Sequence, residues 1–173
     1  FGRLIPDKGP DMAIAAARAV NTPLHIATSP SKKNRASTYY TNKIEPYLDN
    51  KQVVHRGYLQ GKKKIAYIKK AKAFIFPLHW DEPFGLVIIE AMACGTPVVA
   101  FNRGSAPELI KDGVTGYIVD HKKGLPGIIA ALKKIDQIDR RKCREWVEKR
   151  FSVQKNAEDH LAVYKEVLHT GYR

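Results

Sequence analysis

The chain has 173 residues, 44% of them hydrophobic and two of them cysteines, and its formal net charge at pH 7 is +13. A chain of this length indicates one domain with its own apolar core, and it contains neither the ~18-residue apolar stretch of a membrane-spanning helix nor the cysteines of a disulfide framework or zinc site. The basic excess predicts an anionic partner such as phosphates, nucleic acid or an acidic membrane surface, and two thiols favour a reducing, cytoplasmic setting.

The first half of the chain alternates short helical and strand-like segments. Pro10 opens the first helical segment, and Gly57 closes the second strand-like one. The expected elements in chain order are helix 11–20, strand 24–28, helix 37–48, strand 53–55, helix 62–71 and strand 73–77.

The second half continues the alternation with clearer boundaries. Gly95 stops an apolar helix, and Ser105 with Glu108 has the spacing of a capping box at a helix start. The last helix carries an apolar stripe that we expect to cover the core of the domain, a partner domain, or both in part. The expected elements are helix 86–94, strand 97–101, a helix from Ser105, strand 117–119, helices from Leu125 onward and a last helix over 152–168.

Short, continuously apolar strands between helices are typical of a parallel sheet that is covered on both faces. The sequence therefore predicts an α/β fold, a Rossmann-like parallel sheet of about six strands with helices on both faces. In such sheets a ligand binds at the carboxyl ends of the strands. The loops that begin at Gly57, Pro77 and Asn102 should lie at that edge.

The most informative segment is 79–92, which follows a strand and runs into a helix. Gly85 permits a close approach of the backbone to a ligand. The backbone N–H groups of Gly85, Leu86 and Val87 should lie at the helix N-terminus. Those groups and the helix dipole form an anion site that suits a diphosphate.

Two glutamates belong to this segment. Glu90 lies between apolar neighbours, where an unpaired buried carboxylate would cost several kcal/mol, so it is expected to face a polar ligand such as paired sugar hydroxyls. Glu82 precedes the helix and should face the cleft. The alternatives are an ion pair between Glu90 and one of the many lysines, and helix capping by Glu82.

A second segment, 2–10, reads as a strand end, a loop and a helix start. Arg3 and Lys8 could converge there on a phosphate. The alternative for both residues is ordinary surface charge.

These segments together resemble the large family of retaining glycosyltransferases with the GT-B architecture. The family pattern of two glutamates separated by seven residues is present as Glu82 and Glu90. The resemblance covers nearly the whole chain in order, which makes it far more specific than a lone glycine motif. The other matching segments are Gly2-Arg3 with Lys8-Gly9, then 104–108, 112–116 and Phe151-Ser152.

The resemblance implies a role for each matching residue. Arg3 and Lys8 would stabilise the departing diphosphate, and the amides of Gly85, Leu86 and Val87 would hold its oxygens. Glu90 would bind the ribose hydroxyls, and Glu82 would contact the transferred sugar. The base would lie at the loop 57–59, held by the backbone of Leu59, with Lys64 nearby.

The resemblance also implies the substrate and the other half of the enzyme. The chain would be a single C-terminal nucleotide-sugar-binding domain over 1–173, separate from an N-terminal acceptor domain, and it would take a UDP-, GDP- or ADP-linked hexose. No cofactor or metal is expected, since the sequence has no Asp-x-Asp pair and no histidine–aspartate cluster. Without the acceptor domain we expect no glycosyl transfer.

Other readings stay open beside this one. A glycoside phosphorylase or a sugar-nucleotide epimerase has the same architecture, and a basic nucleic-acid-binding module fits the charge but has no recognition signature. We expect no nucleic acid partner. The basic runs, of which most are only solvated faces, could hold a cytoplasmic enzyme at the inner face of an anionic membrane. One departure from the family lies at 27–30, where many relatives have a glycine.

Overall fold

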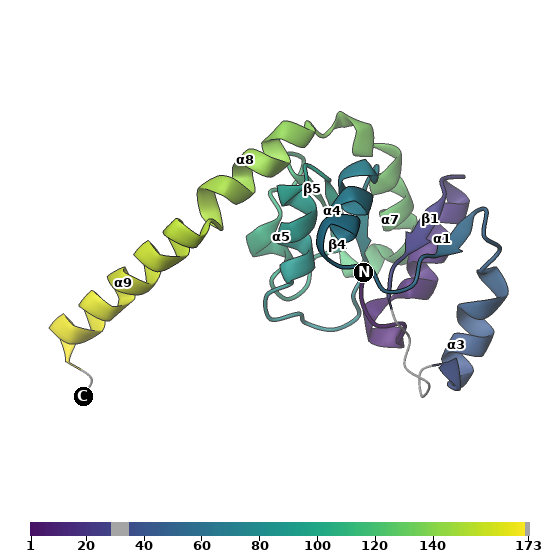
Figure 1. Cartoon of the computed structure of the whole chain (residues 1–173), viewed down its shortest axis with the longest axis horizontal. Coiled ribbons are helices and arrows are strands. Elements are labelled where there is room, and N and C mark those ends of the chain that lie inside the picture. The colour runs from purple at the N-terminus through teal and green to yellow at the C-terminus, as the bar shows by residue number, and fades with distance from the viewer. Residues whose placement is uncertain (29–34, 172–173) are drawn as a thin grey trace.

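A computed structural model of the chain describes residues 1–28 and 35–171. It confirms the predicted α/β class, because parallel strands alternate with helices from one end of the domain to the other (Figure 1). The basic residues Lys32 and Lys33, and Ser29-Pro30 of the departure from the family pattern, lie outside the described residues.

Helices and strands occur where the sequence predicts them, with somewhat different ends. The segment 37–48 is the exception, because it divides into α3 and a short 3-10 helix at Ile44; Pro46 has no N–H with which to continue the helix. The elements are η1 Pro6–Lys8, α1 Pro10–Ala19, β1 Leu24–Ile26, α3 Thr38–Lys43, η2 Glu45–Tyr47, β2 Val53–His55, α4 Gly61–Lys70, β3 Phe74–Phe76, α5 Leu86–Ala93, β4 Val98–Phe101, α6 Ala106–Leu109, β5 Gly116–Val119, η3 His121–Lys123, α7 Gly124–Lys133, η4 Ile135–Gln137, α8 Arg140–Arg150 and α9 Val153–Thr170.

The strands form two parallel sheets. One has the order β1-β2, and the other has the order β3-β4-β5. The described residues contain five strands in place of the predicted six or so. The missing one is the strand end expected near Gly2, because residues 1–3 pair with no neighbour in the described chain and take no strand conformation.

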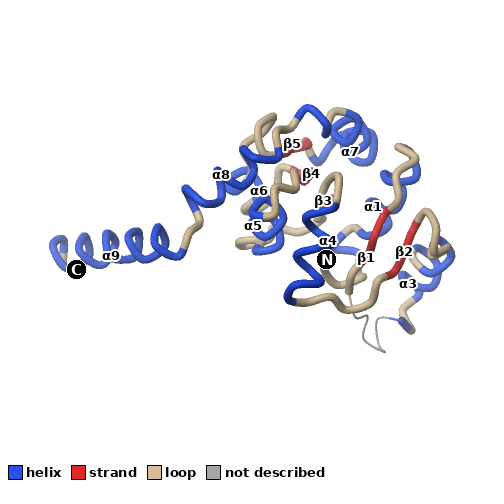
Figure 2. Tube along the Cα trace, turned by 45° about the horizontal axis from the view of Figure 1, so that its top comes forward, coloured by secondary structure: helices blue, strands red, loops and turns tan. Residues whose placement is uncertain are grey.

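The core is centred on β4. All four of its residues are buried, as expected for a continuous apolar run with helices on both faces. Helices α5 and α8 pack against each other on one side, and α1 packs against α7 on the other (Figure 2). A smaller core lies between α1, α3 and the β1-β2 sheet, around Ile14 and Ile44.

The last helix does not cover this core. Helix α9 extends away from the body of the domain, and it contacts mainly α8 (Figure 1). The apolar stripe predicted to pack is instead exposed: Val153 has 89% of its surface in solvent and Leu168 has 82%. The expectation that the stripe covers the domain's own core is therefore wrong.

Arg140 joins three elements at the opposite edge of the sheet from the strand carboxyl ends. Its guanidinium donates to the carbonyls of Lys69 and Ala71 at the end of α4, at 2.7 Å each, and to the hydroxyl of Thr96 at 3.1 Å. The Thr96 hydroxyl, fully buried, donates in turn to the carbonyl of Ile68 at 2.6 Å. The basic run 140–142 thus contains a residue that holds the fold together.

We expect Arg140→Met to destabilise the fold by roughly 1.5–3 kcal/mol, because a charged donor is lost to three acceptors. The matched control is Arg141→Met. Arg141 is exposed, and its one ion pair among residues 1–28 and 35–171 is with Asp139 at 3.2 Å, so its removal should leave stability unchanged within error. Urea unfolding of the two variants measures the difference, and equal midpoints would show that Arg140 is not a structural anchor.

Candidate functional site

The site lies where β3 ends and the segment 79–85 leads into α5. The start of the chain runs beside this segment, since the N–H of His79 donates to the carbonyl of Asp7 at 2.9 Å. Gly9 allows this approach: its φ is +60°, and a Cβ atom there would lie 2.2 Å from the carbonyl oxygen of Pro77. Only glycine therefore fits between η1 and the end of β3.

Lys8 and Glu82 meet at this point although 74 residues separate them. The Lys8 ammonium lies 2.6 Å from a carboxylate oxygen of Glu82, and about a fifth of each side chain is exposed (17% and 21%). The same ammonium lies 4.6 Å from the centroid of the Trp80 ring. Trp80 is 38% exposed, so its ring lies at the surface beside the Lys8 ammonium and is not part of the core.

The N-terminus of α5 lies in the same loop. Its N-cap residue, Gly85, has φ +81° and ψ +55°, which is the left-handed conformation. No side chain of the described residues caps this end. The backbone N–H groups of Leu86 and Val87, in the first turn, thus keep the donor capacity that an anion needs.

Glu90, one turn further along α5, pairs with Lys64 on α4. The two charged groups lie 2.5 Å apart, and the Lys64 ammonium lies 5.6 Å from the centroid of the Phe1 ring. The Glu90 side chain is 45% exposed. The premise that this carboxylate is buried is therefore wrong, whereas the alternative of an ion pair with a lysine is what the structure shows.

The loop 79–85 is braced by a neighbouring loop after β4. Arg103 donates to the Asp81 carboxylate at 3.0 Å and to the carbonyl of His79 at 2.7 Å. These contacts hold the pKa of Asp81 below its usual range. The Ser105 N–H and hydroxyl donate to the carbonyls of Glu82 and Phe84, at 3.0 and 2.6 Å.

Sequence reasoning gave Arg103 and Ser105 no part in the site. The helix predicted at Ser105 begins there, but its side chain makes no capping hydrogen bond, so the capping box is wrong. The same hydroxyl instead binds the motif loop. The family-like segment 104–108 was the available signal, since its position after a strand places it at the same edge of the sheet.

For the remaining predicted residues the structure gives the place in the chain and the exposure. Arg3 is exposed on the segment that leads to Lys8, and Leu59 is half-buried in the loop between β2 and α4. Exposed apolar side chains surround the α5 N-terminus, among them Phe84 at 46% and Leu86 at 67%. His79 is exposed and its Nδ1 atom lies 3.4 Å from Nε2 of His121, so these two histidines face each other at the rim.

Within residues 1–28 and 35–171, no three His, Cys, Asp or Glu side chains gather in a way that could hold a metal ion. None of the helices in these two ranges is long and apolar enough to cross a membrane.

The fold agrees with the comparisons to known proteins. The family described as "Glycosyl transferases group 1" matches residues 1–160. The chain is 34% identical over 120 residues to D-inositol 3-phosphate glycosyltransferase of Mycobacterium sp. (strain KMS), covering 69% of this chain and 27% of that protein. It is 32% identical over 128 residues to the putative glycosyltransferase YtcC of Bacillus subtilis, covering 69% and 31%. The chain belongs to the group 1 glycosyltransferase family.

Solved structures share the fold. AviGT4, a glycosyltransferase of avilamycin A biosynthesis, has a TM-score of 0.79 at 22% identity over 99% of this chain and 51% of its own. Sucrose-phosphate synthase from Thermosynechococcus elongatus has a TM-score of 0.78 at 24% identity, covering 98% and 45%. Anabaena HepE, crystallised with UDP and glucose, has a TM-score of 0.75 at 23% identity, covering 95% and 47%. The chain thus spans about half the length of these structures and about a third of the curated relatives.

We expect Gly104→Ala to disturb the loop 81–84. A Cβ atom at Gly104 would lie 2.5 Å from the Glu82 nitrogen and 2.6 Å from its oxygen. Gly113 is the matched control, because its φ of +71° is equally left-handed and nothing lies within 4 Å of its Cβ position. Gly104→Ala should cost roughly 1–3 kcal/mol more than Gly113→Ala in urea unfolding and should speed amide exchange at Glu82. Equal costs would mean that backbone strain alone explains both.

Proposed function

We propose that this chain is the nucleotide-sugar-binding domain of a retaining glycosyltransferase, which transfers a hexose from a nucleoside-diphosphate sugar to an acceptor hydroxyl without a metal ion. The observation that carries the proposal is the contact of Lys8, at the end of η1, with Glu82 in the loop that leads into the N-terminus of α5. Membership of the group 1 glycosyltransferase family and the Glu82/Glu90 spacing support it.

The chemistry of the departing group explains why these residues lie together. The bond between the anomeric carbon and the diphosphate oxygen breaks, and a bond from that carbon to the acceptor oxygen forms. Negative charge accumulates on the diphosphate as it leaves. Lys8, Arg3 and the amides of Gly85, Leu86 and Val87 are fixed donors directed at that charge, which is electrostatic preorganisation and takes the place of a metal ion. The acceptor oxygen attacks the anomeric carbon on the face that the diphosphate leaves, so configuration is retained, and its proton passes to a phosphate oxygen of the leaving group.

Glu82 and Glu90 take different parts in this proposal. Glu82 lies beside Lys8 and before the helix, where the transferred sugar would be adjacent to the diphosphate. Glu90 is exposed and can accept from a pair of ribose hydroxyls, while Lys64 stays beside it. Each carboxylate pairs with a lysine, Glu82 with Lys8 and Glu90 with Lys64.

The nucleotide lies between these two pairs. The base would lie at the loop 57–59, against the backbone of Leu59 and near Lys64. HepE, which shares the fold, is crystallised with UDP and glucose, so UDP is the first nucleotide to test. GDP and ADP sugars belong to the same screen.

The proposal also covers where the acceptor binds and where the enzyme is located in the cell. Because the chain spans about a third of its curated relatives, we propose that the acceptor is held by a separate N-terminal domain and that this chain alone transfers no sugar. The net charge of +13 supports a cytoplasmic enzyme that is held at an anionic membrane surface.

We expect the chain to bind a nucleoside diphosphate in the presence of EDTA, because its cations and helix N-terminus replace the metal. Isothermal calorimetry with UDP, GDP and ADP measures this, and Lys8→Met should weaken the best ligand by about tenfold or more, the effect of losing a charged contact. Lys62→Met, on the exposed face of α4, is the matched control. Absence of binding by all three at millimolar concentration would contradict the proposal.

We expect the two glutamates to differ in calorimetry with the free nucleoside diphosphate. Glu90→Gln should weaken it roughly 10- to 150-fold, because hydrogen bonds to a charged acceptor contribute about 1.5–3 kcal/mol. Glu82→Gln should not weaken it, since this ligand carries no transferred hexose and the amide leaves Lys8 to the phosphates. Glu108→Gln, exposed on α6, is the control. Equal losses from Glu82→Gln and Glu90→Gln would show that the separate roles are wrong.

A further inference from the structure

Helix α4 is strongly basic. Five of its ten residues are lysines and none is acidic. Lys64 pairs with Glu90 and belongs to the site described above. Like charges on one helix repel one another, so an anionic partner would relieve a repulsion that the helix itself does not offset. The other four lysines are exposed and form no ion pair within residues 1–28 and 35–171: Lys62, Lys63, Lys69 and Lys70.

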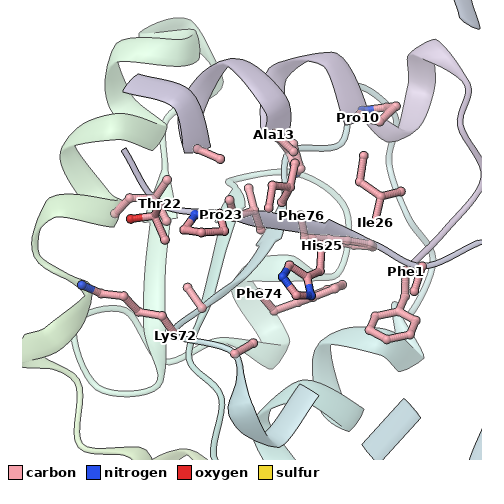
Figure 3. Close-up of a pocket in the computed structure, with 18 of the residues that line it drawn as sticks. Phe1, Pro10, Ala13, Thr22, Pro23, His25, Ile26, Lys72, Phe74 and Phe76 are labelled. Carbon is pink, nitrogen blue, oxygen red and sulfur yellow. The ribbon is translucent and has the colours of Figure 1, made fainter. Parts of the chain in front are cut away.

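The position of α4 leaves most of its surface in solvent. Ile68 is the one buried residue of the helix. Ala66 and Tyr67 border a cavity of about 870 Å³ that β1 and β3 also line. Figure 3 shows this cavity, with His25 of β1 and Phe74 of β3 among its lining residues. Helix α4 therefore contributes little to the core, and packing does not account for its outward side chains.

Two exposed apolar side chains border these lysines. At 3.6 residues per turn, the four lysines lie on the side of α4 opposite Ile68, with Ile65 at one border and Tyr67 at the other. Ile65 has 54% of its surface in solvent and Tyr67 has 36%. Lysines beside exposed apolar side chains are typical of a helix that lies on an anionic lipid surface, where cations meet headgroups and apolar groups enter the acyl boundary.

The other basic runs of the described chain differ from α4. In α8, Glu145 and Glu148 lie among the basic residues, and Arg144 pairs with Glu148 at 2.7 Å. A second group of exposed lysines lies in η3 and at the end of α7, but no large apolar side chain of residues 121–135 is exposed beside it. Unpaired lysines and exposed apolar side chains thus occur together on α4.

We propose that α4 is the surface through which the enzyme contacts an anionic membrane. Lys62, Lys63, Lys69 and Lys70 bind the phosphates of anionic phospholipids, and Ile65 enters the boundary between headgroups and acyl chains. This assignment rests on the proposed membrane location and names the surface responsible for it. Because Lys64 on the same helix pairs with Glu90, the contact holds the nucleotide site near the lipid surface.

The test measures partitioning of the chain onto vesicles of phosphatidylcholine and phosphatidylglycerol, with pure phosphatidylcholine vesicles as the uncharged reference. We expect binding to the anionic vesicles that weakens as the salt concentration rises. Each basic residue at such a surface strengthens binding about fivefold, so loss of four should lower the partition coefficient about a hundredfold or more. The α4 variant combines Lys62→Gln, Lys63→Gln, Lys69→Gln and Lys70→Gln.

The matched control removes four exposed lysines elsewhere and lowers the net charge of +13 by the same four units. It should weaken binding less than about tenfold, because these lysines would lie away from the lipid. Equal losses from the two variants would overturn the assignment to α4 and leave the membrane location standing. Absence of binding by the unchanged chain would contradict the membrane location itself. The control combines Lys122→Gln, Lys123→Gln, Lys133→Gln and Lys134→Gln.

A second pair of variants distinguishes a lipid surface from a soluble polyanion. Ile65→Gln keeps the charge, and it should weaken vesicle binding about fivefold while leaving binding to heparin unchanged. Leu161→Gln on α9 is the control, because Leu161 is 56% exposed, much as Ile65 is, and it should change neither. Unchanged vesicle binding by Ile65→Gln would overturn the lipid assignment and point to a polyanion. Calorimetry with nucleotide tests the proposed site separately, since none of these side chains belongs to it.

Discussion

The site depends on two close backbone contacts that only glycine permits. Gly9 lies against the carbonyl of Pro77, and Gly104 lies against the backbone of Glu82. The first contact brings Lys8 beside the end of β3, and the second holds the motif loop against the loop after β4. Three segments far apart in the sequence thereby meet at one edge of the sheet. A side chain at either glycine would move the charged groups before it altered the core.

Charge balance is the second feature of this edge. A domain with a net charge of +13 gathers cations near the α5 N-terminus, whose dipole is also positive. Glu82 and Glu90 offset these charges through their pairs with Lys8 and Lys64. A diphosphate between the pairs would offset the same charges with its own oxygens. The site is thus electrostatically prepared for an anion while it remains neutralised by its own carboxylates.

The sequence predicted most of this fold because the strands are short apolar runs bounded by glycine or proline, as at Pro97–Phe101 and Gly95. It also predicted which loops share an edge, since the carboxyl ends of parallel strands do. It failed where a pattern has two physical readings. The α9 stripe is apolar at helical spacing, which does not say whether a core lies beneath it.

Two polar residues show the same ambiguity, because the sequence pattern around each suggests a contact that differs from the one in the structure. Glu90 has apolar neighbours in sequence, yet it lies on the exposed side of a helix that buries Ile88 and Met92. Ser105 has capping-box spacing, yet its hydroxyl donates to the carbonyl of Phe84 and makes no capping hydrogen bond to α6. Such contacts join residues about 20 apart, and local sequence spacing carries no information on them.

The central proposal is that an anionic ligand binds at the N-terminus of α5 between the two lysine–glutamate pairs. The most direct measurement is an NMR titration of the chain with UDP in EDTA, following the backbone amides of Gly85, Leu86 and Val87. We expect these three amides to shift together and to saturate, with Lys8 and Lys64 side-chain resonances shifting over the same concentration range. Saturable binding that leaves the three amides unchanged would contradict the proposal, because the nucleotide would then lie elsewhere.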